Sequence, residues 1–125
     1  MITAIIDRLK TGSIQNVIPL GDNVANPEKP YVVVWKGDPT QQAGAGENGN
    51  DNYSVNAHFP PGHVNQLEDY IETETWQLLN DKILTTRDGR KLKLESTSRI
   101  GKTFQGNDDK TISKLREFTT PGIYE

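Results

Sequence analysis

The chain of 125 residues contains no cysteine, a single methionine and few apolar residues, 33% of the total. The absence of cysteine excludes disulfides and thiolate metal sites, and it fits folding in a reducing cytoplasm. No apolar run approaches the ~20 residues of a membrane-spanning helix, and Asp7 and Arg8 break the apolar start of the chain, so we expect neither a membrane span nor a signal peptide. The net charge of −3 argues against a protein that coats nucleic acid.

A reactive cluster is also missing from the sequence pattern. The two histidines, His58 and His63, bracket Pro60-Pro61-Gly62 without a third ligand at a recognisable spacing. We interpret them as a surface strand residue and a residue at a helix start. The glycine-rich segment 44–49 has neither the flanking strand-to-helix transition nor the charge of a phosphate-binding loop. We therefore expect no catalytic residues, no metal and no cofactor.

Charge is instead segregated along the chain. Segment 64–81 carries five acidic residues and no Lys or Arg, whereas segment 82–102 carries seven basic residues against two acidic ones. A small domain with opposed charged elements favours docking onto other proteins. The acidic residues of the predicted docking face are Glu68, Asp69, Glu72 and Glu74, and the basic candidates for an interface are Arg87, Arg90, Lys91, Lys93, Arg99 and Lys102.

The basic segment has two interpretations. Its charges are either the solvated outer face of a hairpin, which protects an edge strand from aggregation, or a contact with an acidic subunit face or with DNA phosphates. Strand alternation places Lys91 and Lys93 on one face. No aromatic residues are interleaved with these cations, so base stacking is not expected.

Apolar periodicity predicts a single α+β domain over residues 1–125, with an antiparallel or mixed β-sheet, two helices packed on one face and a projecting β-hairpin. Gly12 is expected to end the first helix in a left-handed conformation. Residues 37–52 are rich in Gly and Asn, and we expect a flexible loop between two strands of a hairpin. The expected elements are a helix at 1–11, an extended segment at 13–20, a strand at 31–35 covered on both faces, a strand at 53–59, a helix at 64–79 and a hairpin at 82–86 and 90–95. A polar loop follows at 96–109, with or without a short strand at 99–100, and the last strand at 111–119 contains either a bulge or a switch of face.

Several segments carry a resemblance to a known family. The segments are Ile2-Thr3-Ala4-Ile5-Ile6-Asp7-Arg8-Leu9, Pro30-Tyr31-Val32-Val33-Val34, Val55-Asn56-Ala57-His58-Phe59-Pro60-Pro61-Gly62 running into the Leu67–Leu79 helix, the hairpin at Asp88-Gly89, and the closing Pro121-Gly122. Their order resembles the small tail-terminator proteins, also called tail-completion or minor tail proteins, of long-tailed bacteriophages. The match is one of pattern over most of the chain rather than of an invariant motif.

The resemblance implies a structural virion protein rather than an enzyme. Such a protein forms a ring, commonly a hexamer, at the head-proximal end of the tail tube, stops tube growth and joins the tail to the head-side connector. Viral DNA passes through the lumen without sequence recognition, and assembly takes place in the bacterial cytoplasm. Two alternatives remain at this point: a head-closure or neck protein of the same junction, and a small non-viral protein-binding adaptor.

Overall fold

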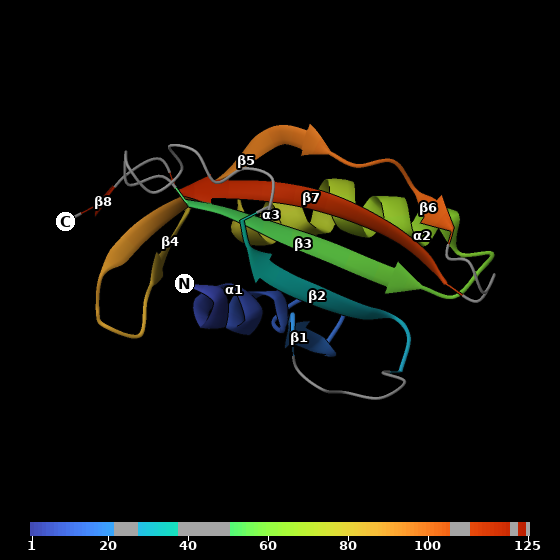
Figure 1. Ribbon diagram of the computed structural model, residues 1–125, viewed down its shortest axis with the longest axis horizontal. Helices are drawn as coiled ribbons and strands as arrows, with labels where there is room; N and C mark the ends of the chain where they lie inside the picture. The colour runs from blue at the N-terminus through green and yellow to red at the C-terminus, as the bar shows by residue number, and fades with distance from the viewer. Residues whose placement is uncertain (22–27, 38–50, 106–110, 121–122, 125) are drawn as a thin grey trace.

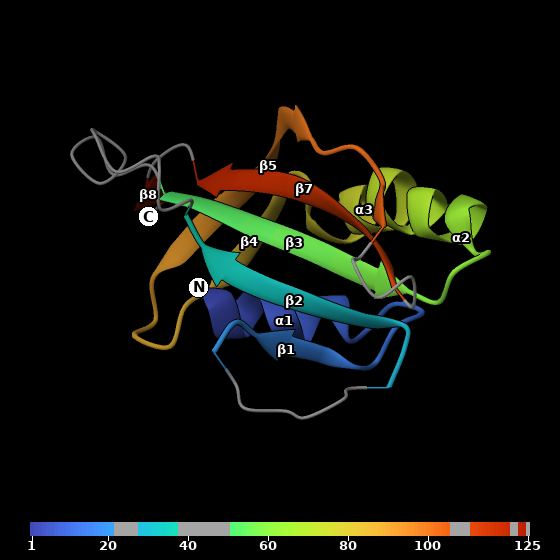
Figure 2. The same ribbon diagram turned by 45° about the vertical axis from the view of Figure 1, so that its right-hand side comes forward.

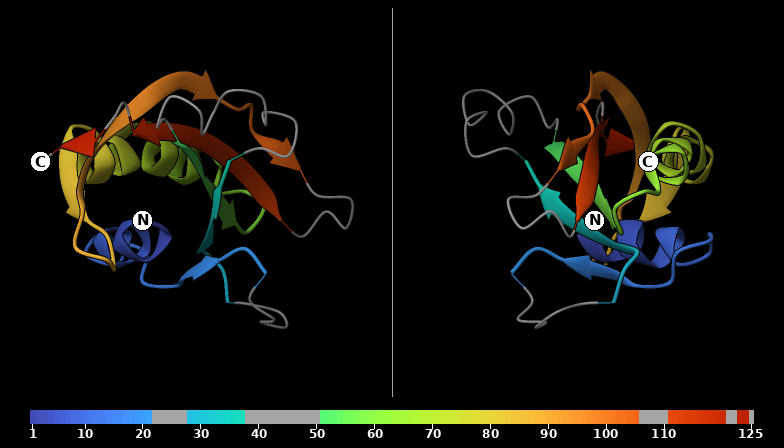
Figure 3. Two further views of the ribbon diagram at one scale, coloured as in Figure 1. Left: turned by 60° about the vertical axis from the view of Figure 1, so that its left-hand side comes forward. Right: turned by 90° about the vertical axis from the view of Figure 1, so that its right-hand side faces the viewer.

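A curled mixed β-sheet with two helices packed against it makes up the computed structural model, which describes residues 1–21, 28–37, 51–105, 111–120 and 123–124. Figure 3 shows the sheet bending around the helices, which lie on its concave side. The expected α+β class is confirmed. The elements are α1 (Ile2–Leu9), β1 (Val17–Pro19), β2 (Tyr31–Lys36), β3 (Asp51–Phe59), α2 (Val64–Asp69), the π-helical turn η1 (Tyr70–Glu74), α3 (Thr75–Leu79), β4 (Lys82–Thr85), β5 (Lys91–Ile100), β6 (Phe104–Gln105), β7 (Ile112–Thr120) and β8 (Ile123–Tyr124).

The strand order is β1-β2-β3-β7-β5-β4, with β6 added beside β7 and β8 beside β5 (Figure 1). Only the β1–β2 pair is parallel among the described strands; the other pairs are antiparallel. The central pair β3–β7 runs without a break from Asp51 opposite Thr120 to Phe59 opposite Ile112. The second helix packs on this long uninterrupted ladder, whereas α1 packs on β1 and β2.

The first helix α1 buries the apolar stripe that the sequence predicts, through Ile5, Ile6 and Leu9. Figure 2 shows α1 lying alongside β1 and β2. The expected left-handed stop at Gly12 is wrong, because the helix ends at Lys10 in a right-handed conformation and Gly12 has no positive φ. Gly12 is instead closely packed: a Cβ there would lie 2.6 Å from Glu74 Oε2 and 2.7 Å from Leu78 Cδ1, so these two side-chain ends would have to shift.

The second helix, formed by α2, η1 and α3, buries residues at a constant spacing of four: Leu67, Ile71, Thr75 and Leu79 are all fully buried. In a regular α-helix of 3.6 residues per turn, each step of four advances about 40° around the axis, so such a stripe would drift off the sheet. The wider π-helical turn η1 rotates less per residue and counteracts this drift. One irregular turn thus keeps the stripe on the core.

Three expectations about strands are corrected by the structure. β2 is not covered on both faces: Val32 and Val34 are fully buried, whereas Tyr31, Val33 and Trp35 on the other face are half-buried. The bulge lies in β5, where the register to β7 shifts between Ser96 and Ile100, and not in β7. Segment 96–100 therefore belongs to a strand, because its backbone pairs with β7 despite its polar side chains.

The flexible loop expected at residues 37–52 falls largely outside the described residues. Its ends are described. Gly37 follows β2 with a φ of +73°, and Asp51 and Asn52 already belong to β3. The strand begins two residues earlier than the side-chain pattern suggests, since the backbone of Asn52 pairs with Thr119.

The hairpin of β4 and β5 is confirmed. Thr85 lies opposite Lys91, Ile83 lies opposite Lys93, and Leu92 and Leu94 on the other face are buried. The turn closes at Gly89, whose φ of +88° favours glycine. Among the described residues no helix is long and apolar enough to cross a membrane.

Candidate functional site

Three of the six predicted basic residues, Arg87, Arg90 and Lys91, gather at the turn end of the hairpin. The side chains of Arg87 and Lys91 are exposed and form no hydrogen bond or ion pair with the described part of the chain. Arg90 Nε lies 3.0 Å from Asp88 Oδ2 in a fully solvated pair. The hairpin end therefore presents cations that its own fold leaves available.

The other three basic residues do not belong to this patch. Lys93 Nζ lies 2.8 Å from Asp81 and 3.4 Å from Glu95, so its charge is neutralised within the subunit. Arg99 lies farther along β5 and bonds Glu117 at 3.3 Å, a carboxylate that is itself buried. Lys102 is exposed beyond the end of β5. The structure thus separates the hairpin patch of Arg87, Arg90 and Lys91 from the ion-paired Lys93 and Arg99. Lys102 belongs to neither group.

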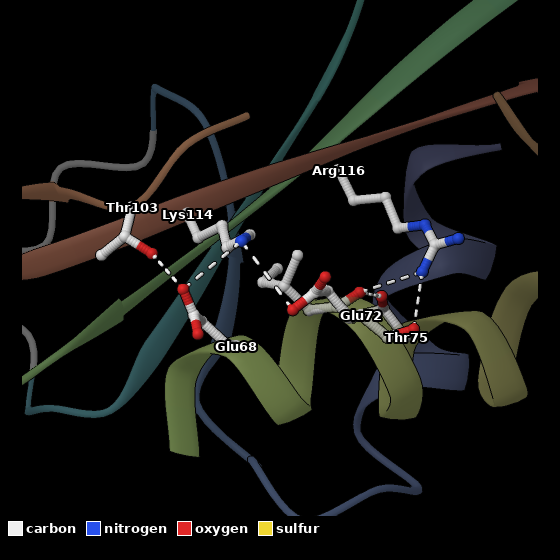
Figure 4. Close-up of polar contacts among 7 residues, drawn as sticks. Glu68, Glu72, Thr75, Thr103, Lys114 and Arg116 are labelled. Atoms are coloured by element: carbon white, nitrogen blue, oxygen red, sulfur yellow. Dashed lines mark hydrogen bonds and ion pairs between the residues drawn. The ribbon is translucent and has the colours of Figure 1, made fainter. Parts of the chain in front are cut away.

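The four predicted acidic residues on the second helix also divide. Glu68 and Glu72 point toward the sheet, where Lys114 Nζ lies 3.7 Å from Glu68 and 3.9 Å from Glu72 (Figure 4). Glu74 accepts hydrogen bonds from the backbone N–H of Ser13 at 2.8 Å and from its hydroxyl. Asp69 alone among the four is exposed with no partner in the described residues.

Beneath the second helix lies a layer of buried charge that sequence reasoning missed. Lys114 and Arg116 of β7 are nearly fully buried on the face that packs against the helix. Thr103 Oγ1 donates to Glu68 at 3.0 Å and completes the network around Lys114. The period-two alternation of a strand was present in the sequence, because the side chains of residues 112, 114, 116, 118 and 120 all face the core. It was missed because two of these residues, Lys114 and Arg116, are charged.

Arg116 holds the π-helical turn to the sheet. Its guanidinium donates to the carbonyl oxygens of Ile71 at 3.2 Å and Glu72 at 2.9 Å (Figure 4). Its Nε donates to the Ser96 hydroxyl at 2.8 Å. The guanidinium also lies over the Phe118 ring, 5.7 Å from the centroid. Burial lowers the pKa of Arg116, and the nearby Glu72 carboxylate opposes that shift. This buried layer links the second helix to β7, because its charged groups form hydrogen bonds and ion pairs within the subunit.

Neither histidine belongs to a group that could hold a metal ion in the described part of the chain. His58 stacks on Tyr31 with ring centroids 4.6 Å apart, and burial, with Lys29 adding to it, lowers its pKa. His63 precedes α2, where its Nδ1 lies 2.5 Å from Gln66 Oε1. Over the described ranges no three His, Asp or Glu side chains converge as metal ligands.

An open groove of about 660 Å³ runs between the second helix and the segment before β2. Its lining residues include the apolar Ile14, Pro30 and Phe59 and, on the helix, Asp69 and Tyr70. The hydroxyl of Tyr70 is buried and has no hydrogen-bond partner among the described residues.

No protein-family model matches the sequence, and no curated protein is a significant match to it.

Proposed function

We propose that this protein is a structural subunit of a bacteriophage tail, a tail terminator that forms a ring at the head-proximal end of the tail tube. In this role it stops tube polymerisation and joins the tail to the head-side connector. The ring is a hexamer in the proposal, as the family resemblance implies, and viral DNA passes through its lumen. The protein would be made in the host cytoplasm and carried in the virion, and the role requires no catalysis.

The observation that carries the proposal is the placement of unpaired charge. The hairpin turn, which carries the unpaired cations, lies at one end of the molecule, and α2, which ends at the unpaired Asp69, lies at the other (Figures 1 and 2). A subunit with complementary surfaces at opposite ends associates head to tail, which closes into a ring when the rotation permits.

The proposal is tested by adding the purified protein to polymerising tail-tube subunits and measuring tube length by electron microscopy. A terminator shortens tubes and appears as a ring at one tube end. Binding to DNA-filled heads without binding to tubes would identify the head-closure alternative instead. Binding to neither particle would contradict a role at this junction and favour the adaptor alternative.

A matched variant pair sharpens this experiment. Arg87→Glu combined with Lys91→Glu reverses the two unpaired hairpin cations, whereas Lys102→Glu reverses an exposed cation outside the hairpin patch. Only the double variant should fail to cap tubes, with both variants folded by circular dichroism. Normal capping by the double variant would show that the hairpin patch is a solvated edge.

A further inference from the structure

We propose that the groove is the acceptor site for the hairpin end of a second copy of this chain. The inference rests on the proposed ring and names the two surfaces that would build it. The hairpin end is defined here by Ile83, Thr85, Arg87 and Lys91. The groove is defined by the residues that line it between the second helix and Ser13, Ile14, Pro30 and Phe59.

The groove suits a partner that is both apolar and cationic. Its apolar floor comes from Ile14, Pro30 and Phe59, and Asp69 and Glu74 lie along its helical side. No Lys or Arg is among its lining residues. The free carboxylate of Asp69 therefore faces no compensating charge within the groove.

The hairpin end supplies those two properties. Ile83 is 56% exposed, a large fraction for an isoleucine, and it shares the outward face of β4 and β5 with Thr85 and Lys91. Arg87 stands at the turn beside them. The hairpin end therefore combines the exposed apolar Ile83 with the unpaired cations of Arg87 and Lys91. The groove combines an apolar floor with the unpaired carboxylate of Asp69, so the two surfaces are complementary.

The edge of the sheet adds a third match. β4 ends the strand order, so one side of its backbone has no strand beside it in the described chain. An unpaired strand edge can form backbone hydrogen bonds to a neighbouring subunit.

The two surfaces lie on different parts of the molecule, so one copy cannot fill its own groove. Figures 1 and 2 place the hairpin turn beside the N-terminus and α2 at the far end of the long axis. The contact is therefore heterologous, and each subunit uses its hairpin on one neighbour and its groove on the other.

A mixing experiment tests this geometry directly. The hairpin variant carries Arg87→Glu and Lys91→Glu, and the groove variant carries Asp69→Lys and Gln77→Lys, all at exposed positions. In sedimentation over a concentration series, each variant alone should stay at the subunit mass of 14.0 kDa. Their equimolar mixture should regain the wild-type mass, since the intact hairpin meets the intact groove and the reversed hairpin meets the reversed groove with opposite charge. A mixture that remains monomeric while the wild type assembles, or a single variant that assembles like the wild type, overturns the proposal.

Disulfide trapping covers weak association, because the natural chain has no cysteine to interfere. Ile83→Cys mixed with Gln77→Cys should give a heterodimeric disulfide in high yield. Ile83→Cys mixed with Asn65→Cys, an exposed position on the same helix outside the groove, should give little. Equal yields from both pairs, or a wild type that stays monomeric throughout and no preferential cross-link, would refute the contact.

The two proposals can fail separately. Rings that cap tubes without the Ile83–Gln77 cross-link would leave the terminator role standing and remove this interface. A cross-link, and assembly restored by mixing the two variants, in a protein that ignores tail tubes would leave the interface standing and remove the terminator role.

Discussion

Arg116 is the residue that ties the irregular turn of the second helix to the sheet. It donates to two helix carbonyls and to the Ser96 hydroxyl from a side chain that is almost wholly buried. A π-helical turn shifts the backbone from its regular hydrogen-bonding register, so carbonyls at such a turn need other donors. Thr75 Oγ1 supplies one more, at 2.6 Å from the Ile71 carbonyl.

Replacing Arg116 with Met should lower the free energy of unfolding by about 1–3 kcal/mol, because buried acceptors lose their donor. Urea unfolding monitored by circular dichroism measures the change. Lys102→Met removes an exposed cation without a partner in the described residues and should stay within about 0.5 kcal/mol of wild type. An Arg116→Met variant as stable as the control would show that the bonds to the turn contribute nothing.

His58 gives the fold a dependence on pH. Burial against Tyr31 and the charge of Lys29 lower its pKa below the ordinary value of 6.5. The unfolded chain therefore binds more protons than the folded one between the two pKa values. This contribution is complete above pH 6.5 and is lost as pH falls through the lowered pKa.

The His58→Gln variant should lose less stability than wild type when pH is lowered from 7.5 to 5. Carboxylates titrate in both proteins, so the difference between their pH profiles isolates the histidine. Thermal unfolding at matched buffer strength measures it. Parallel profiles for the two proteins would contradict the lowered pKa of His58.

At the scale of elements, the second helix shows how an irregularity can be required by a regular pattern. Leu67, Ile71, Thr75 and Leu79 are spaced by four, and the π-helical turn keeps all of them on the sheet. The apolar stripe was readable from the sequence. The turn that aligns it was not, because its stabilising donor, Arg116, lies more than forty residues away.

Inserting one Ala after Thr73 should rotate Thr75 and Leu79 away from the core by about 100°, one residue of an α-helix. We expect loss of cooperative unfolding, or a destabilisation of several kcal/mol from exposed apolar groups and new cavities. Thr73→Ala keeps the residue count at this exposed position and should be close to neutral. An insertion variant with wild-type stability would show that the helix register set by the turn is incidental.

For the whole molecule, the separation of unpaired charge predicts that self-association weakens as salt rises. The hairpin patch and Asp69 are exposed, and mobile ions screen such charges over ~8–10 Å at physiological ionic strength. Sedimentation in dilute and in concentrated NaCl should show a smaller average mass at high salt. A mass that grows with salt would indicate an apolar interface, and the assigned contact would then be wrong.

Local pattern sufficed for much of the fold. Periodicity located α1, the second helix, β3 and the β4–β5 hairpin, and the Asp88-Gly89 turn was evident, since these features depend on neighbours in sequence. The hairpin patch was foreseen in part: Arg87, Arg90 and Lys91 do gather, whereas Lys93 and Arg99 have partners on their own subunit.

Long-range pairing decided the rest. The strand order β1-β2-β3-β7-β5-β4 joins segments far apart in the chain, and it alone brings Lys114 and Arg116 beneath the second helix. Charged residues at inward positions look like surface residues in a sequence, because their burial is tolerated only when distant carboxylates and carbonyls compensate them. The same long-range packing forms the groove. It also leaves the buried hydroxyl of Tyr70 without a hydrogen-bond partner among the described residues. The sequence by itself determined the elements and the separation of charge, whereas the tertiary structure decided which of those charges brace the domain and which remain free to bind.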